Sequence, residues 1–334
     1  MRLTRRAALA GLGALALPGV ARAAEQTRFP VGISVRPLAA FEPRRPEQRR
    51  FGALQFRSGL VLSSGHPRFG GFSGLARLNG GRDLVAVSDR GDWLTAKVAS
   101  ANGRLVGLEG GEMAAILGSS GRPLARSGRF DTESLCIHEG TAFVGIERKH
   151  EIVRLDWARD GVEAHARPVP VPPEIKRLPS NRGLEALGVM PAGPLKGALV
   201  AIAERSGKAD EPTLGAILGG PQPGLFKLAR HDGYDITDLA FLPSGDMLVL
   251  ERWYQPLRGV GMRMRRIAGR DIRPGALVDG PRLIEADLGF EIDNMEGLSI
   301  HLEEGRTILT LISDDNFSFL QRTLLLEFEL VQPT

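Results

Sequence analysis

The chain has 334 residues, with 43 lysines and arginines against 39 aspartates and glutamates and a formal net charge of +4. Four arginines (Arg2, Arg5, Arg6 and Arg22) lie in the first 23 residues, which hold no acid, so the remainder is balanced at 39 basic and 39 acidic residues. This balance gives no reason to expect binding to nucleic acid or to an anionic membrane. The single cysteine, Cys136, excludes an intrachain disulfide.

The first predicted element is an export signal. The pair Arg5-Arg6 precedes an apolar run over 7–20, and Ala21-Arg22-Ala23 has the small-x-small form of a cleavage site. The apolar run is too short to remain as a membrane anchor. We therefore predict a twin-arginine signal peptide over 1–23, with an ordinary secretory signal as the alternative. The mature chain, 24–334, is expected to be one periplasmic or secreted domain that meets the twin-arginine translocase during export and keeps no membrane anchor after cleavage.

The mature sequence predicts many short strands. Glycine (42 residues) and proline (22 residues) are frequent, and helical periodicity is weak. Short apolar runs lie between turn signals, at 84–87, 142–146, 198–203, 247–250 and 307–312. Each unit begins with a polar or acidic residue that is followed by a small residue and a leucine. A turn and the apolar run come next, and an acidic residue ends the unit. The first markers of these five units are Ser73, Glu133, Glu185, Asp238 and Glu296, at intervals of 60, 52, 53 and 58 residues.

A repeat of this length is typical of a β-propeller, with one four-stranded blade per unit. Two further strand-like stretches, 51–62 and 323–331, lie outside the five units. We therefore predict an all-β fold, a β-propeller with a preferred count of six blades, closed by strands from the N and C termini. A pair of β-sandwiches with similar hairpins is the alternative.

The repeated acids are the candidate site, because equivalent positions of propeller blades converge near the central axis. Carboxylates gathered there must bind a cation, pair with arginines or keep protons. The first predicted ring, assigned to metal binding, contains Glu133, Glu185, Asp238 and Glu296. The second, assigned to completing the site or to general-base catalysis, contains Asp89, Glu147, Glu204, Glu251 and Asp314. Oxygen donors without zinc-type histidine or cysteine spacing favour Ca²⁺ over Mg²⁺.

Arginines follow four of the second-ring acids: Arg90, Arg148, Arg205 and Arg252. Guanidinium groups bind phosphate and carboxylate, so these residues are the predicted substrate-binding set for a small anionic ester or phosphoester. The alternative is an internal acid–arginine network that locks the blades together.

The chain resembles the bacterial phytase-like family, which is described as having esterase-like activity of phytase. The similarity is carried by five ordered motifs: Gly71-Phe72-Ser73-Gly74-Leu75, Asp131-Thr132-Glu133-Ser134, Asn181-Arg182-Gly183-Leu184-Glu185, Ile236-Thr237-Asp238, and Asn294-Met295-Glu296-Gly297-Leu298 with Ser313-Asp314-Asp315-Asn316-Phe317. The resemblance implies a propeller-like fold and calcium-dependent hydrolysis of a phosphate ester. Two hypotheses remain beside a metal-dependent hydrolase: a non-catalytic propeller that binds a ligand or protein in the cell envelope, and a calcium-dependent lactonase.

Overall fold

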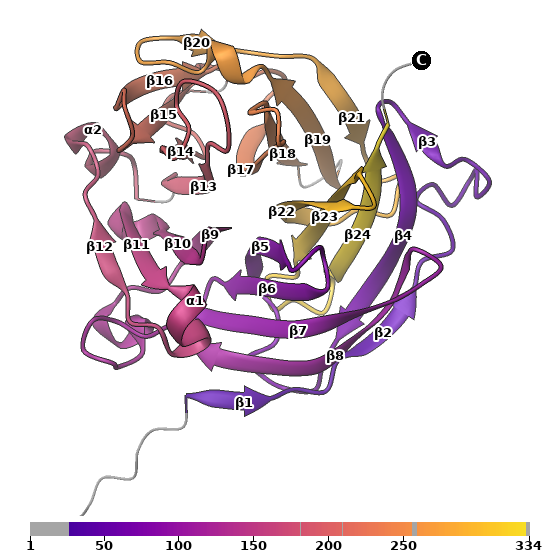
Figure 1. The fold of residues 1–334 in the computed structure, drawn as a ribbon. Helices are drawn as coiled ribbons and strands as arrows, with labels where there is room; N and C mark the ends of the chain where they lie inside the picture. Colours follow the sequence, from indigo (N-terminus) through magenta and orange to yellow (C-terminus); the bar gives the residue numbers. More distant parts are fainter. Residues whose placement is uncertain (1–26, 181, 209, 256–258, 332–334) are drawn as a thin grey trace, which may run out of the picture.

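The computed structural model describes residues 27–180, 182–208, 210–255 and 259–331, and the predicted signal peptide at 1–23 lies outside them. The described residues form five sheets arranged as blades around one axis (Figure 1). Neighbouring strands are antiparallel, except for β20, which is parallel to β16. None of the described helices is both long enough and apolar enough to cross a membrane.

In the first three blades the strands follow one another from the axis outward in chain order, and β1 and β20 add an outer strand to the first and third. The first contains β5 (Phe72–Leu78), β6 (Asp83–Ser88), β7 (Asp92–Ala101), β8 (Arg104–Ala115) and β1 (Arg28–Pro30). The second contains β9 (Thr132–His138), β10 (Thr141–Ile146), β11 (Glu151–Asp156) and β12 (Arg167–Val169). The third contains β13 (Leu184–Val189), β14 (Leu199–Ala203), β15 (Thr213–Leu218), β16 (Gly224–Leu228) and β20 (Leu277–Val278).

The last two blades complete the ring. The fourth contains β17 (Asp235–Phe241), β18 (Met247–Gln255), β19 (Gly259–Ile267) and β21 (Arg282–Ala286). The fifth contains β22 (Asn294–Glu303), β23 (Arg306–Asp314), β24 (Thr323–Leu330), β4 (Leu54–Ser63) and β2 (Ser34–Pro37), and β3 (Arg50–Phe51) also pairs with β4. Short helices occur in the connections: α1 (Trp157–Asp160), α2 (Pro173–Lys176), η1 (Leu124–Ser127), η2 (Glu147–Lys149), η3 (Gly161–Glu163) and η4 (Gly269–Asp271).

The predicted all-β propeller is confirmed, but the preferred count of six blades is not, because the structure has five. The inner strands contact one another in the cyclic order β5, β9, β13, β17, β22 and back to β5. The two stretches outside the repeat form no sixth blade. Instead β24 pairs with both β23 and β4, so both stretches supply outer strands to the fifth blade.

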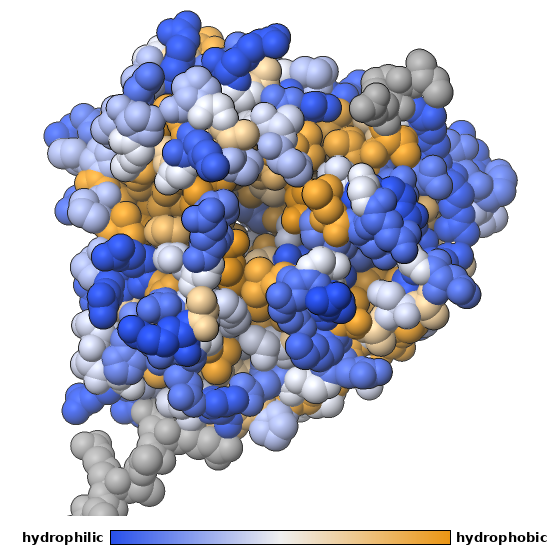
Figure 2. All heavy atoms as spheres, viewed as in Figure 1, coloured by the Kyte–Doolittle hydropathy of each residue, from blue (hydrophilic) through white to orange (hydrophobic). Residues whose placement is uncertain are grey.

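Close packing of the inner strands explains the small residue of each repeat. A Cβ atom on Gly74 would lie 2.7 Å from the backbone nitrogen of Leu135 in the next blade, and one on Gly297 would lie 3.2 Å from that of Leu75. Larger apolar side chains fill the wedges between blades. Phe41, for example, is fully buried and packs edge-on against Phe51 and Phe328 beside the fifth blade. Figure 2 shows hydrophilic side chains over much of the outer rim and apolar ones nearer the middle of the ring.

Candidate functional site

Both predicted groups of acids lie at the same end of the propeller. Each inner strand is antiparallel to the second strand of its blade, so the start of one lies beside the end of the other. Thr132 at the start of β9 pairs with Ile146 at the end of β10, and Met295 pairs with Ser313 in the fifth blade. The first-ring and second-ring positions are therefore neighbours rather than opposite ends of a channel.

A bulge in every inner strand positions the first group. In each blade one residue near the start of the inner strand has no partner in the ladder, which is the arrangement of a β-bulge. The five unpaired residues are Ser73, Glu133, Glu185, Thr237 and Glu296. Glu133 of the second blade and Glu296 of the fifth interact electrostatically although their blades are not adjacent. These side chains therefore face the axis.

The fourth blade departs from the predicted alignment by one residue. Its bulge is at Thr237, so Asp238 occupies the small-residue position that Gly74 and Gly297 hold in other blades. The Asp238 carboxylate is fully buried and accepts hydrogen bonds from the backbone nitrogens of Leu298, at 2.6 Å, and Leu239, at 2.8 Å. The structure thus places Asp238 as a link between the fourth and fifth blades and not with the bulged carboxylates.

The same offset moves Glu251 out of the second group. Glu251 pairs with Ile236 in the ladder. Ser88 in the first blade and Ser313 in the fifth have the equivalent pairing. The next residue, Arg252, therefore occupies the position that Asp89 and Asp314 hold in those blades. The buried Glu251 carboxylate instead accepts from Arg263 at 2.7 Å and from Arg265 at 2.5 Å. The second group at the axial end therefore consists of Asp89, Glu147, Glu204, Arg252 and Asp314.

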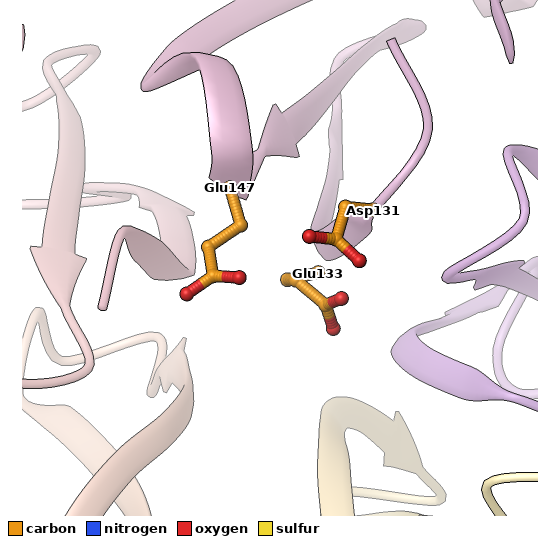
Figure 3. A group of neighbouring side chains, drawn as sticks. All are labelled: Asp131, Glu133 and Glu147. Atoms are coloured by element: carbon orange, nitrogen blue, oxygen red, sulfur yellow. The ribbon is translucent and has the colours of Figure 1, made fainter. Parts of the chain in front are cut away.

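Among the described residues, two groups of three carboxylates are close enough to hold a cation. Oxygen atoms of Asp131, Glu133 and Glu147 lie within 4.8 Å of one another, and so do oxygens of Glu147, Glu185 and Glu204. Figure 3 shows the first group, whose side chains converge from β9, from the residue before it and from η2. Asp131 was not among the predicted site residues. Its signal in the sequence is its place two residues before Glu133. In the structure Asp131 has a left-handed backbone, with φ of 71°.

The profile of the Phytase-like family, described as esterase-like activity of phytase, matches residues 67–317. The chain belongs to this family. The matched range contains both groups of three carboxylates and the motifs around them. No curated protein sequence matches the chain.

Solved structures similar to this Phytase-like chain are distant. The PQQ-bound aldose sugar dehydrogenase of Streptomyces coelicolor is 13% identical, with 89% of this chain and 98% of that chain covered and a TM-score of 0.39. The allergen Mala s 1 of Malassezia sympodialis is 12% identical, with 84% and 91% covered and a TM-score of 0.43. Myxococcus xanthus glutaminyl cyclase is 11% identical, with 79% and 92% covered and a TM-score of 0.40. Likeness at this level carries no argument about activity.

Burial and mutual repulsion shape the titration of the carboxyl groups of this Phytase-like site. Burial, reinforced by neighbouring acids, raises the pKa of Glu133 and of Glu185 well above the usual range. Burial also raises the pKa of Glu204 to about 7, with Asp235 adding to the shift, and that of Asp314 to about 8, with Glu296 adding. Without a counter-ion, the cluster therefore retains protons near neutral pH.

The four predicted substrate-binding arginines have different surroundings. The Arg148 guanidinium donates to Asp131 at 2.6 Å, and Arg205 lies 3.5 Å from Asp235. The Arg90 guanidinium carbon lies 3.3 Å from the centroid of the Phe317 ring. These three lie around the acids of this end.

Arg252 differs because it occupies a second-group position itself. It donates to Glu296 at 2.7 Å and lies 3.9 Å from Glu204. The charge of Glu296 raises the pKa of Arg252, burial opposes this rise, and the charge of Glu204 adds to it. Arg252 therefore neutralises the side of the cluster that faces the fourth and fifth blades. Asp131 is paired with Arg148, whereas Glu133, Glu147 and Glu185 form no ion pair with an arginine or lysine among the described residues.

The donor set fits a hard cation. The groups of three contain only carboxylates, which are the ligands that Ca²⁺ prefers. The Oδ1 atom of Asp89 is buried and has no hydrogen-bond partner among the described residues. A buried carboxylate oxygen without a donor is costly, and a cation or a bound water molecule would satisfy it. This observation bears on Asp89 independently of the spacing of the other acids.

His150 is a further candidate that the sequence interpretation did not include. It is buried, and its Nδ1 atom has no hydrogen-bond partner within the described part of the chain. A Cβ atom on Gly183 would lie 2.7 Å from the Cγ atom of Glu147 and 2.9 Å from this Nδ1. Gly183 thus leaves room for Glu147 and His150 side by side, and its own nitrogen donates to Glu147 Oε1 at 3.0 Å.

A cavity of about 1310 Å³ lies next to this site but does not include its acids. The residues 117–127 line one wall of the cavity, and β11 and the segment 166–171 line the other. Arg129 joins the walls through its ion pair with Glu151, at 2.6 Å. The cavity lies on the outer side of the second blade, away from the axial carboxylates.

Proposed function

We propose that this protein is an exported, Ca²⁺-dependent hydrolase of ester or phosphoester bonds. The observation that carries the proposal is the convergence of carboxylates from the first, second, third and fifth blades at one end of the axis, with the Asp89 Oδ1 atom left without a donor. Membership of a family described by esterase-like activity supports the hydrolytic class. Arg5-Arg6 and the small-x-small site at 21–23 support export.

Each group has a role in this proposal. Glu133, Glu147, Glu185 and Glu204, with Asp131, would hold Ca²⁺, which would supply charge to polarise an ester oxygen and to acidify a water molecule. Arg252 would orient the anionic part of the substrate by a bidentate contact, in exchange for one of its present carboxylate partners. Asp89, whose pKa burial raises to about 6, or Asp314 would take a proton from the attacking water, because a base that titrates near neutral pH is suited to this task.

The test is turnover of p-nitrophenyl phosphate and p-nitrophenyl acetate by chelator-treated protein, before and after Ca²⁺ is added. We expect Ca²⁺ to restore turnover of at least one ester, and Glu133→Gln to abolish it while the melting transition remains cooperative. Glu304→Gln is the matched control, because that side chain is 85% exposed and lies near the opposite end of β22. Ca²⁺-independent turnover, or a fully active Glu133→Gln variant, would contradict the proposal.

Arg252 also favours a second candidate, the non-catalytic propeller. Its ion pairs with Glu296 and Glu204 join the third, fourth and fifth blades and would serve as an internal lock. A Ca²⁺-induced rise in melting temperature with no turnover of either ester, or of an aliphatic lactone tested beside them, would favour this binding protein with structural calcium. Turnover of the lactone alone would favour the calcium-dependent lactonase.

A further inference from the structure

The loop between β23 and β24, residues 315–322, exposes two large apolar side chains. Phe319 is 96% exposed and Leu320 is 78% exposed. Because β23 ends at Asp314, one of the axial acids, this loop starts at the acid-bearing end of the propeller. Apolar side chains exposed to this degree are costly to keep in water and commonly mark an interaction site when they are grouped.

The loop is held in place by its own polar contacts. Asp315 Oδ1 accepts from the backbone nitrogens of Gly71 and Phe317, each at 3.0 Å, and Asp315 Oδ2 accepts from the Thr323 hydroxyl at 2.9 Å. A Cβ atom on Gly70 would lie 2.6 Å from Asp315 Oδ1, so the first blade leaves room for this carboxylate. Phe317 itself has a left-handed backbone, with φ of 50°, which is uncommon for a bulky residue. The exposure of Phe319 is therefore a property of a supported loop.

Exposed apolar side chains gather at this end of the molecule. Eight large hydrophobic residues are exposed among the described residues. Five lie at the acid-bearing end by their positions next to strand ends: Phe130, Tyr254, Leu288, Phe319 and Leu320. Val106 and Leu302 lie at the opposite end, near the start of β8 and the end of β22, and Leu277 lies on the outer strand β20. The asymmetry distinguishes the two ends.

Cations accompany these side chains. Arg90 and Arg148 directly follow axial acids, and Lys149 follows Arg148; all three are exposed. The Arg90 guanidinium lies over the Phe317 ring, and the Arg148 guanidinium lies 5.1 Å from the centroid of the Phe130 ring. The balanced charge of the whole chain conceals this local arrangement. Apolar side chains that protrude between exposed cations are suited to the boundary between headgroups and acyl chains of an anionic membrane.

We propose that loop 315–322 docks the acid-bearing end of the propeller onto an anionic phospholipid surface, with Phe319 and Leu320 entering the headgroup region. The apolar residues at this end come from four separate segments, at Phe130, Tyr254, Leu288 and Phe319–Leu320, so a deformable bilayer would accept them without a matching pocket. Arg90, Arg148 and Lys149 would contact lipid phosphates. The inference does not depend on the proposed hydrolysis, since it concerns only where this end of the protein is held.

The first test is sedimentation of the full chain with vesicles of phosphatidylcholine alone or with an equal part of phosphatidylglycerol. We expect binding to the anionic vesicles and a loss of at least tenfold in partition coefficient for Phe319→Ser/Leu320→Ser. The matched control is Val106→Ser/Leu302→Ser, which removes two exposed apolar side chains from the opposite end and should bind like the parent. Equal binding by the parent and the loop variant would overturn the proposal.

The second test separates docking by the loop from attachment by the apolar segment at 7–20. In the Phe319→Trp variant, the added indole fluorescence should be quenched by brominated phospholipid in anionic vesicles, whereas the added signal of Leu302→Trp should not. Attachment through the N-terminal segment alone would leave both added signals unquenched and would overturn the proposal. So would loop-dependent binding that requires a protein partner and is not seen with vesicles.

Discussion

Replacing Glu185 by glutamine should have opposite effects without and with calcium. Glu185 is 8% exposed, and its carboxylate is within 4.8 Å of those of Glu147 and Glu204. At that separation two charges repel by about 3 kcal/mol when the effective dielectric constant is about 20. Glutamine has nearly the same shape and no charge, so the calcium-free variant should be more stable than the parent.

The size of the gain is bounded by proton uptake. Protonating a carboxyl group with an ordinary pKa of 4.5 at pH 8 costs about 5 kcal/mol. Glu185 would take up a proton if the repulsion were larger than this, so repulsion destabilises the folded state by no more than about 5 kcal/mol. Part of the gain is offset by contacts that favour the charged form, including the field of Arg252. We expect a net increase of about 2 kcal/mol in the free energy of unfolding, or roughly 4 °C in melting temperature for a domain of this size.

Calcium should reverse the order of stabilities. A cation that binds only the folded state stabilises it in proportion to the logarithm of its concentration over the dissociation constant. Loss of one carboxylate should weaken that binding roughly tenfold or more. The assay is calorimetric melting at pH 8 with chelator and then with increasing Ca²⁺, and Glu304→Gln is the control. A Glu185→Gln variant that is less stable than the parent in chelator and melts like it in Ca²⁺ would refute the reasoning.

Three further predictions concern other parts of the fold. Glu251→Gln should lower the free energy of unfolding by about 3–5 kcal/mol, because it leaves the buried Arg263 and Arg265 without their shared carboxylate; urea unfolding that shows a loss below 1 kcal/mol would contradict this. Asp238→Asn should lower the free energy of unfolding by about 1–3 kcal/mol, because one of the two backbone N–H donors then faces an amide nitrogen. The same variant should show the parent's increase in melting temperature with calcium. Burial and Arg77 lower the pKa of His301 from 6.5 to about 4. Between these two values the unfolded chain binds more protons at this residue than the folded protein does. The free energy of unfolding therefore decreases as the pH falls from 6.5 to 4. His301→Gln should remove roughly 1–2 kcal/mol of the acid destabilisation measured between pH 7 and pH 5; an unchanged pH dependence would contradict the assignment.

The repeat predicted the fold class because each blade needs its own inner strand, turn and small residue. It did not predict the blade count, because 51–62 and 323–331 look like strands whether they form a new blade or complete an old one. Their pairing to each other, between Leu54 and Leu330 for example, is a long-range contact that no local pattern contains.

The acids of the second and third blades were identifiable because their spacing is regular. The fourth blade was misaligned because Asp238 and Glu251 are each one residue away from the positions that face the axis. Thr237 and Arg252 hold those positions, and a bulge is what sets the register. Charge and periodicity alone could not distinguish an acid in the bulge from an acid beside it. That both groups lie at one end could have been inferred from the antiparallel hairpin of each unit.

The position of β24 makes the completion of the fifth blade depend on residues that are synthesised long after β4. This last strand is inserted between β23 and β4, so a ribosome-bound chain that lacks it has a gap in the middle of its fifth sheet rather than a missing edge. Strand β4 (Leu54–Ser63) therefore finds this neighbour only after residues 323–330 have been synthesised. A nascent or prematurely terminated chain would remain an open arc, with unpaired backbone on both sides of the gap for quality control to detect.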